Sequence, residues 1–500
     1  MNRYLPFLFF IPFAALLYSC GPEEAFLTDP AAKLEFSLDT LRFDTVFTQL
    51  GSATRQFKVY NRNDRPVRVS QIRILGSSKV KFRMNVDGIP GSDIREVEIG
   101  ANDSIYVFAE VTIDPNQPVS VSPFIVEDKI VFETNGNLQE VRLEAWGQNA
   151  NYFPSRFNRG VPVVLSCRNG EITWNDPKPY VIYGIVFIDS CTVNIPAGTR
   201  IYVHGGIARN DLFGVFNDGM LYTLPNGRIR MTGTREKPVI VQGVRLEAPF
   251  QDEPGQWAGI VLGKRSKGNV VENTHIRGSI FGIYADSASD LTLRNTRIYH
   301  TSSSGLIGVR SRITAENCLI YKNLSNSVVL SHGGDYSFSY STICSYGVNA
   351  AALSASNYFC YDDPLLCRAR SDYRLNASFR NCIFFGSQKD QIRLADVSGG
   401  NPASMFNLSF QNCVVRAEGL LTEQNNRYAQ FFQTYCTDCI NGKATDRLFV
   451  DPAKDNFYLD SLSIALDKGK PIASPQPLLF DLEGKARSAT APDPGCFERN

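Results

Sequence analysis

The chain has 500 residues, of which 43% are hydrophobic and 20% are charged, and its formal net charge is +1. This length is enough for two or three domains with their own cores, and the composition excludes an intrinsically disordered chain. The near-neutral charge also gives no sign of a nucleic-acid-binding surface, which would need an excess of Lys and Arg.

The first twenty residues predict export across a membrane. Asn2-Arg3 forms a short positive head, and the apolar run from Leu5 to Leu17 is too short to span a bilayer as a stable helix. Residues 1–19 are therefore expected to be a signal peptide that the mature protein lacks. The sequence Leu17-Tyr18-Ser19-Cys20 resembles the bacterial lipobox. The resemblance implies that Cys20 carries acyl chains such as palmitate and becomes the new N-terminus.

The residues after Cys20 bear on where the protein is attached. Each buried methylene of an acyl chain adds about 0.8 kcal/mol, so several chains on one cysteine would hold the protein on a membrane. Gly21 resembles the sorting signal of outer-membrane lipoproteins, and Glu23-Glu24 resembles the surface-export tag of Bacteroidota lipoproteins. We expect an outer-membrane lipoprotein that faces the periplasm or the cell exterior, with residues 20–27 as an anchor linker. An ordinary secretory signal is the alternative.

Residues 28–150 alternate apolar and polar side chains in short runs, for example Phe57-Lys58-Val59-Tyr60 and Ile105-Tyr106-Val107-Phe108. Gly, Asn, Asp and Pro separate these runs, so the segment is expected to be a β-sandwich. The runs Asp44–Phe47, Val59–Asn61 and Arg142–Ala145 look like the immunoglobulin-like modules of bacterial envelope proteins. That resemblance implies a spacer or binding adaptor, and the segment contains no catalytic cluster.

A repeat follows from about Ile172. A motif of the form Asn-Thr/Cys-x-apolar returns with its first residue at Asn273, Asn295, Asn317, Ser341, Asn381 and Asn412. The shortest intervals set a coil of about 22 residues, and stacked coils of this length predict a parallel β-helix over residues 151–440. The residues two before and three after the Asn are mostly apolar and are expected to face the interior.

An outward-facing row in the later coils is unusual because it is apolar. The position two residues after the Asn is occupied by His275, Arg297, Leu319, Ile343, Ile383 and Val414. A continuous apolar exterior is rarely left in water. An insertion at about 346–373, a closing segment at 441–500 or a partner protein must cover it, and aromatic residues in both segments favour covering by the chain itself.

The segments that flank the repeat resemble a known superfamily. Ile195–Ile201, Met231–Ile240 and Trp257–Ile260 look like the opening coils of the pectin-lyase-like superfamily, and Asp481-x-x-Gly484-x-x-Arg487 with Asp493–Glu498 resembles the closing segment of Bacteroidota β-helix lipoproteins. The resemblance implies an all-β chain, in which an immunoglobulin-like β-sandwich precedes a right-handed parallel β-helix. It says little about activity, because this scaffold carries lyases, hydrolases and adhesins.

The best catalytic candidates lie four and five residues after the repeat Asn, on one outer face. A polysaccharide lyase needs a base that removes the proton beside a uronate carboxylate, and a cation that neutralises this carboxylate. The candidates are Arg277, Tyr299, His300, Tyr321 and Lys322. Outer positions of a β-helix often carry such residues for solubility, so no catalytic residue is assigned. A non-catalytic surface that binds a polysaccharide or an envelope protein, within an outer-membrane assembly or outside one, is the favoured interpretation, and a polysaccharide lyase is the alternative.

Cysteine and acidic residues give weaker signals. Cys360/Cys367 and Cys436/Cys439 could pair in an oxidising envelope. Zinc at Cys436 and Cys439 would need two more ligands, and the four histidines, His204, His275, His300 and His332, are not grouped around them. No cofactor or metal is expected. A calcium site at Asp286, Asp290 or Asp335 stays open as a weaker alternative, although no dense acidic cluster is present.

Overall fold

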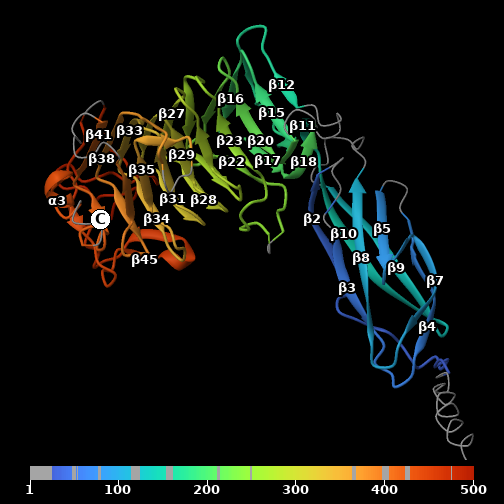
Figure 1. Ribbon diagram of the computed structural model, residues 1–500. Coiled ribbons are helices and arrows are strands. Elements are labelled where there is room, and N and C mark those ends of the chain that lie inside the picture. Colours follow the sequence, from blue (N-terminus) through green and yellow to red (C-terminus); the bar gives the residue numbers. More distant parts are fainter. Residues whose placement is uncertain are drawn as a thin grey trace, which may run out of the picture. The chain divides into compact units, whose positions relative to one another are not determined.

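A computed structural model describes residues 25–499, apart from 48–51, 53, 77–79, 114–123, 154–161, 211–213, 248–249, 363–366, 397–404, 423–427 and 474–475. The predicted signal peptide and Cys20 lie outside the described residues. The chain divides into two compact units, residues 1–149 and 150–500 (Figure 1). In the part that is described, no helix has the length and apolar character needed to cross a membrane.

The first unit is a sandwich of two five-stranded sheets, almost entirely antiparallel. One sheet has the order β1 (Glu35–Phe36), β3 (Arg55–Tyr60), β8 (Ser104–Ile113), β5 (Val80–Val86), β6 (Ile89–Gly91). The other has the order β2 (Thr40–Phe47), β10 (Asn137–Gln148), β9 (Phe124–Thr134), β4 (Val67–Ile74), β7 (Asp93–Ile99). The predicted β-sandwich is confirmed, and its immunoglobulin-like character stays a prediction.

Alternation along each strand builds the core of the sandwich. In β4, Val67 and Val69 are fully buried, whereas Arg68 between them is exposed. Asn61 is also fully buried, and its side-chain amide donates hydrogen bonds to the carbonyl oxygens of Arg65, Ile99 and Gly100. These bonds offset the cost of burying the amide and fix the chain where β3 ends.

The second unit is a right-handed parallel β-helix of three sheets. The eleven-stranded sheet contains β11 (Asn151–Phe153), β14 (Tyr180–Tyr183), β17 (Arg200–His204), β22 (Val239–Gly243), β25 (Thr274–Arg277), β28 (Arg297–Thr301), β31 (Leu319–Asn323), β34 (Thr342–Ser345), β39 (Ile383–Gly386), β42 (Val414–Val415) and β44 (Ile440–Asn441). The nine-stranded sheet contains β12 (Val163–Leu165), β15 (Ile185–Ile188), β20 (Met220–Thr223), β23 (Gly259–Leu262), β26 (Ile283–Ala285), β29 (Leu306–Val309), β32 (Val328–Ser331), β35 (Leu353–Ser356) and β40 (Ile392–Ala395). The ten-stranded sheet contains β13 (Glu171–Thr173), β16 (Thr192–Pro196), β21 (Arg228–Thr232), β24 (Asn269–Glu272), β27 (Asp290–Arg294), β30 (Arg312–Glu316), β33 (Gly334–Ser339), β38 (Leu375–Arg380), β41 (Phe406–Gln411) and β43 (Cys436–Thr437).

The repeat Asn occupies the turn from the ten-stranded to the eleven-stranded sheet. Its φ is positive in five coils, a conformation that Asn tolerates better than most residues, and the φ values are 45° at Asn273, 47° at Asn295, 52° at Asn317, 50° at Asn381 and 53° at Asn412. The amides also bond between coils, because Asn317 Nδ2 donates to Asn295 Oδ1 at 3.2 Å. The repeat motif is therefore a ladder of left-handed turns.

In the fourth coil, the predicted position of the repeat motif is wrong by one residue. Tyr340, with φ of 47°, takes the place of the Asn, and Ser341 follows it. Leu319 therefore pairs with Thr342 and Ile320 with Ile343, so Ile343 faces the interior and not the exterior. The apolar outward row consequently has Thr342 in this coil.

The closing segment, residues 441–500, covers this outward row. Three strand residues of the row, Leu319, Ile383 and Val414, are buried in one cluster with Phe449, Phe457, Leu459 and Phe497 of the closing segment. Phe449 and Phe457 belong to the hairpin of β45 (Phe449–Asp451), η4 (Pro452–Lys454) and β46 (Asn456–Leu459), and Figure 1 shows β45 beside β31 and β34. The chain therefore covers the eleven-stranded sheet itself.

The insertion lies elsewhere. Residues 353–356 form the regular strand β35, so the insertion is shorter than the expected 346–373. It forms a hairpin of β36 (Tyr358–Cys360) and β37 (Arg370–Asp372), which the disulfide Cys360–Cys367 links. A second disulfide, Cys167–Cys191, was not predicted.

Candidate functional site

The five predicted catalytic candidates come together on the outer face of the eleven-stranded sheet. Arg277, Tyr299 and Tyr321 are register partners on β25, β28 and β31, so they stack in successive coils. The rings of Tyr299 and Tyr321 are parallel with centroids 5.0 Å apart, and the His300 ring meets Tyr299 edge-on at 5.1 Å. His300 and Lys322 both have positive φ. The predicted constellation therefore exists.

Two carboxylates from outside the sheet form ion pairs with the basic side chains of this group. Asp455, which follows η4, lies 2.6 Å from Lys322 Nζ and 3.5 Å from His300 Nε2. Asp252, in the loop before β23, lies 3.4 Å from His300 Nδ1 and 3.6 Å from Arg277 Nη1. Each candidate base or cation thus has an intramolecular partner, which the sequence did not indicate.

Several side chains of this group are also buried. The exposed fraction is 7% for His300 and 5% for Tyr321, and Phe457 of the closing segment packs on Tyr321 with ring centroids 4.8 Å apart. Burial lowers the pKa of His300, although both nearby carboxylates act in the opposite direction. Burial raises the pKa values of Tyr299 and Tyr321. The lowered pKa favours the neutral imidazole of His300, which could accept a proton, and the closing segment limits access to it.

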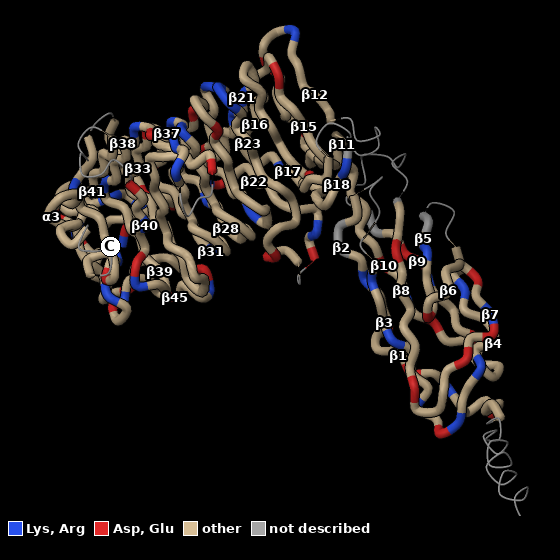
Figure 2. Tube along the Cα trace, viewed as in Figure 1, with Lys and Arg blue, Asp and Glu red and all other residues tan. Residues whose placement is uncertain are grey.

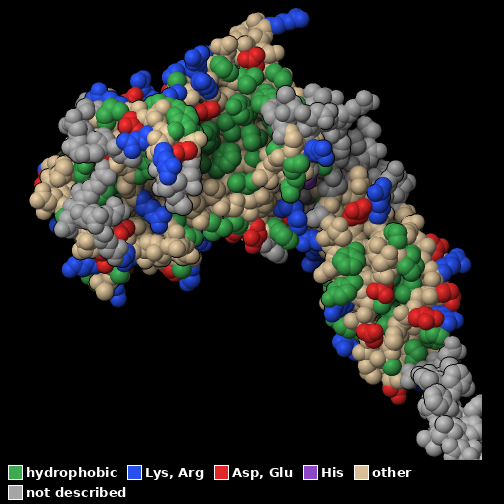
Figure 3. Space-filling model, in the orientation of Figure 1, with side chains coloured by type: hydrophobic (Ala, Val, Ile, Leu, Met, Phe, Trp, Pro, Cys, Tyr) green, Lys and Arg blue, Asp and Glu red, His purple; other side chains and the backbone are tan. Residues whose placement is uncertain are grey.

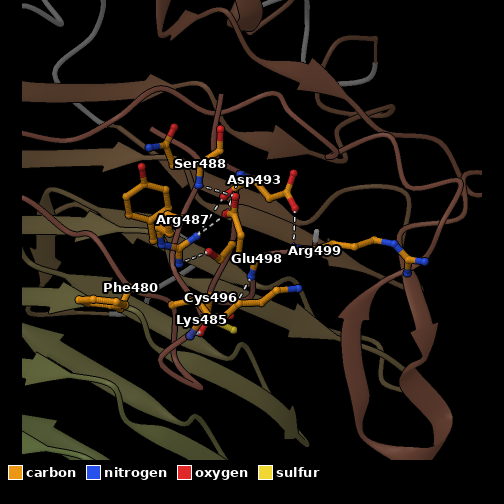
Figure 4. A network of polar contacts seen from close by, with 12 residues as sticks. Phe480, Lys485, Arg487, Ser488, Asp493, Cys496, Glu498 and Arg499 are labelled. Atoms are coloured by element: carbon orange, nitrogen blue, oxygen red, sulfur yellow. Dashed lines mark hydrogen bonds and ion pairs between the residues drawn. The ribbon is translucent and has the colours of Figure 1, made fainter. Parts of the chain in front are cut away.

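The pattern Asp481-x-x-Gly484-x-x-Arg487 and the residues 493–498 at the end of the chain build a buried polar network (Figure 4). The Arg487 side chain is 2% exposed and lies 3.3 Å from the carboxylate of Glu498, which is 3% exposed. Its guanidinium donates to Asn317 Oδ1 at 3.0 Å and to the carbonyl oxygens of Asp493 and Gly495. Burial lowers the pKa of Arg487. Arg487, at the centre of this polar network, thus joins the closing segment to the ladder of repeat Asn residues.

The carboxylates of this network accept hydrogen bonds from backbone N–H groups. Asp481 Oδ1 accepts from the backbone N–H groups of Glu483 and Lys485, and its Oδ2 accepts from that of Glu498. Glu498 accepts from the N–H groups of Ser488 and Asp493. Every acidic group of the pattern therefore holds a turn, and we assign the network a structural role.

The residues considered for calcium do not converge. Asp290 lies 3.8 Å from Lys267 Nζ, and Asp335 accepts a hydrogen bond of 2.8 Å from Asn376 Nδ2. Asp286 accepts a hydrogen bond from the backbone N–H of Ser287. Within the described ranges, no group of three or more His, Cys, Asp or Glu side chains could hold a metal ion.

A different surface stays open on the nine-stranded sheet. One outward position in seven successive strands forms what we call the outer row: Val164, Phe187, Tyr222, Val261, Tyr284, Ile307 and Val329. Val164 is exposed, Val261 is buried between its neighbours, and the other five are half-buried. Most residues on either side of the row members belong to the core cluster. In Figure 3, hydrophobic side chains gather over β20 and β23 in a hollow of this face.

The outer row combines aromatic rings with nearby charge. The Phe187 and Tyr222 rings meet edge to face at 5.3 Å. Burial raises the pKa of Tyr222 and of Tyr284, and the nearby charge of Asp286 raises both further. At the turn after β23, Lys264 and Arg265 are exposed and have no ion-pair partner among the described residues.

Figure 2 shows few charged residues along the strands of this sheet and more at its turns. The hollow is therefore apolar along its floor and charged at its rim. The hollow was not predicted from the sequence because its side chains are not part of the repeat motif that begins at the Asn. Tyr284, Ile307 and Val329 are spaced by 23 and 22 residues, close to the coil length, and this column would have indicated part of it.

The comparisons with known proteins concern the fold. The family model described as the right handed beta helix region matches residues 257–359. Pectate lyase Pel9A is 12% identical over 70% of this chain and 88% of its own, with a TM-score of 0.28. The catalytic unit of the GH87 α-1,3-glucanase from Streptomyces thermodiastaticus is 10% identical over 72% of each chain, with a TM-score of 0.22.

A further match concerns a smaller part of the chain. The secreted serine protease VesC from Vibrio cholerae is 12% identical with a TM-score of 0.17, and the match spans a quarter of each chain. Among curated proteins, none is similar enough to this chain to be a relative. The right-handed parallel β-helix is thus supported by the family model.

Proposed function

We propose that the β-helix binds glycan chains along the outer face of its nine-stranded sheet, and that the protein is a glycan-binding lipoprotein of the cell envelope. The observation that supports this proposal is the outer row, which places apolar or aromatic side chains in seven successive coils. The closing segment covers the comparable apolar row of the eleven-stranded sheet but not this one.

The chemistry of the hollow suits a sugar polymer. An apolar surface left partly open in water marks a binding site, and aromatic rings present flat apolar faces against which sugar rings can stack. Asp286, Lys264 and Arg265 at the rim can bond hydroxyl or acidic groups. Coils repeat at about 4.8 Å, so a ligand that also repeats along its length meets similar contacts in each coil.

The envelope location rests on the predicted lipid anchor at Cys20. Its test is replacement of Cys20 by Ala, followed by membrane fractionation of cells that express the full chain. Release of the variant from the membrane fraction supports the anchor, and retention contradicts it. No nucleic-acid partner is proposed, and an envelope protein partner is not required to cover the eleven-stranded sheet.

The binding proposal is tested with the double variant Tyr222→Ala and Tyr284→Ala. Two aromatic contacts contribute about 1–3 kcal/mol, so we expect roughly tenfold or greater loss of affinity. The affinities are measured by calorimetry on a panel of acidic and neutral polysaccharides. Tyr106→Ala, at an exposed ring of the first unit, is the matched control and should bind as the unsubstituted protein does. Unchanged binding by the double variant, or no binding by the unsubstituted protein, contradicts the proposal.

A polysaccharide lyase is the second candidate, favoured by the convergence of Arg277, Tyr299, His300, Tyr321 and Lys322. In such an enzyme, neutral His300 would take the proton beside a uronate carboxylate, and Arg277 with Lys322 would neutralise this carboxylate. Unsaturated products absorb in the ultraviolet. Product formation that Lys322→Ala and His300→Ala abolish supports the lyase, and absence of turnover on every uronate polymer of the panel contradicts it.

A further inference from the structure

We propose that Cys436 and Cys439 form a third disulfide, which staples the last coil of the β-helix. Both residues flank the turn between β43 and β44, at the point where Asp438 has a φ of 54°. Cys436 pairs with Phe410 of the preceding coil, and the next strand pairs Ile440 with Val414.

The two thiols point toward the same place. Cys436 and Cys439 both pack against the β-helix core, and each thiol lies close enough to the other to shift its pKa. Cys439 also donates a hydrogen bond of 3.4 Å to the carbonyl oxygen of Phe410. The left-handed residue Asp438 turns the chain from the ten-stranded to the eleven-stranded sheet, so Cys436 and Cys439 lie on either side of one sharp corner.

Exposure separates this pair from the other thiols. The remaining free cysteines of the described chain, Cys318, Cys344, Cys382, Cys413 and Cys496, are buried, whereas Cys436 and Cys439 are partly exposed. Cys439 follows Asp438 and extends the column of Cys318, Cys382 and Cys413, in which other coils have Thr274 and Thr296. Unlike those three thiols, it lies in the last coil and is partly exposed. A thiol must be reachable to exchange with another protein. Only Cys436 and Cys439 meet this condition among the described free thiols.

The last coil is joined to the stack by few paired residues. Both β43 and β44 pair with the preceding coil through two residues each, whereas β41 pairs with β38 through six. An end coil with so few ladder bonds opens readily and exposes an unpaired edge. A covalent link across its turn restricts that opening.

The bond forms by thiol–disulfide exchange with a disulfide-bearing oxidase of the exporting compartment. The thiolate of Cys439 attacks one sulfur of the oxidase disulfide, and the oxidase's other sulfur leaves as a thiolate. Cys436 then attacks the mixed disulfide and releases the second oxidase thiolate. The oxidase gains the two electrons and two protons that the cysteines lose. The neighbouring thiols of Cys413 and Cys436 lower the pKa of Cys439, which favours its role as the attacking thiolate.

Peptide mapping of the exported full chain tests this bond. Protein is purified without reductant, its free thiols are alkylated in denaturant, and trypsin releases residues 428–443, which contain both cysteines. We expect this peptide unalkylated and two hydrogen atoms lighter than its reduced form. Cleavage before Asp438 separates the two cysteines, so the halves should stay joined until reductant is added. Alkylation of both thiols, or a link from Cys439 to Cys413 in the peptide 394–416, overturns the proposal.

Hydrogen exchange measures the consequence. Amides of Ile440 and Asn441 should exchange roughly tenfold faster in Cys436→Ser than in the oxidised protein, because a short disulfide loop restricts opening by about 1–2 kcal/mol. Cys382→Ser, at a buried thiol outside the pair, is the control and should leave the mapped disulfide intact. Equal exchange rates in Cys436→Ser and the oxidised protein contradict the stapling role.

Discussion

Two outer faces of the same β-helix differ in whether the chain covers them. On the eleven-stranded sheet, Leu319, Ile383 and Val414 face outward and are at most 2% exposed, because the closing segment packs on them. On the nine-stranded sheet, Tyr222 and Ile307 occupy equivalent outward positions and are half-buried, with no such cover among the described residues. Both rows arise from the same period and the same strand alternation.

The difference indicates which face is structural and which is available. The closing segment is long enough to cover one apolar face, and its polar network is fastened to the Asn ladder that borders this face. The apolar row that the closing segment leaves open is then expected to bind a ligand, because a continuous apolar surface is rarely left exposed to water. Function is therefore sought on the open face, and the predicted catalytic constellation belongs to the covered one.

The largest effect is expected when the cover is released by Arg487→Ala. Its loss leaves the buried carboxylate of Glu498 without its cation, and removal of one partner from a buried ion pair costs roughly 3–5 kcal/mol. The change is measured as the free energy of unfolding in urea. Arg312→Ala, at a side chain that is 68% exposed, is the control and should cost less than about 1 kcal/mol. Equal losses for the two variants would mean that the network does not hold the cover.

A matched pair of isoleucines tests the comparison directly. Ile383 on the covered face is fully buried, so Ile383→Ala should cost roughly 2–5 kcal/mol through lost burial and a residual cavity. Ile307 on the open face is half-buried, and Ile307→Ala should cost less than about 1 kcal/mol. Unfolding in denaturant measures both. If Ile307→Ala cost as much as Ile383→Ala, the nine-stranded face would be packed and not open, and the glycan-binding proposal would lose its basis.

The sequence predicted the architecture well because the β-helix is a repeat. The Asn ladder sets the coil length, and alternation places the interior columns. The error at the fourth coil has a physical reason, since Tyr is an unusual residue at a left-handed turn. Tyr340 is held there by the Arg487 guanidinium, 3.9 Å from its ring centroid, and by a hydrogen bond from its hydroxyl to the Lys470 carbonyl oxygen. These partners lie more than 100 residues away, so no local pattern could reveal them.

The site was predicted only in part for a related reason. Arg277, Tyr299 and Tyr321 were placed together because they share the period, but Asp252 and Asp455, which occupy the cluster, come from irregular loops. The outer row of the nine-stranded sheet loses its period from Phe187 to Tyr222 and from Tyr222 to Val261, because longer connections intervene there. A repeat period in the sequence therefore predicts side chains on regular coils, but it does not predict contacts made by residues of irregular loops.

The smallest expected effect concerns His275, at the edge of the cover. Leu482 and Glu483 of the closing segment enclose it in a pocket of 220 Å³. Burial lowers its pKa from 6.5 to about 4, and the charges of Arg297 and Arg277 add to this shift. Between these pH values the unfolded chain binds a proton at His275 that the folded chain does not. This group therefore makes the protein less stable as the pH falls through that window.

Replacing the imidazole should remove this dependence. The unsubstituted protein is expected to lose roughly 2 kcal/mol more than His275→Gln between pH 7 and pH 4, measured by urea unfolding at both pH values. Since the cover causes the burial, Arg487→Ala should return the pKa of His275 toward 6.5 in an NMR titration, where only four histidines contribute signals. A pKa near 6.5 in the unsubstituted protein would show that the edge of the covered face is as open to water as the nine-stranded sheet.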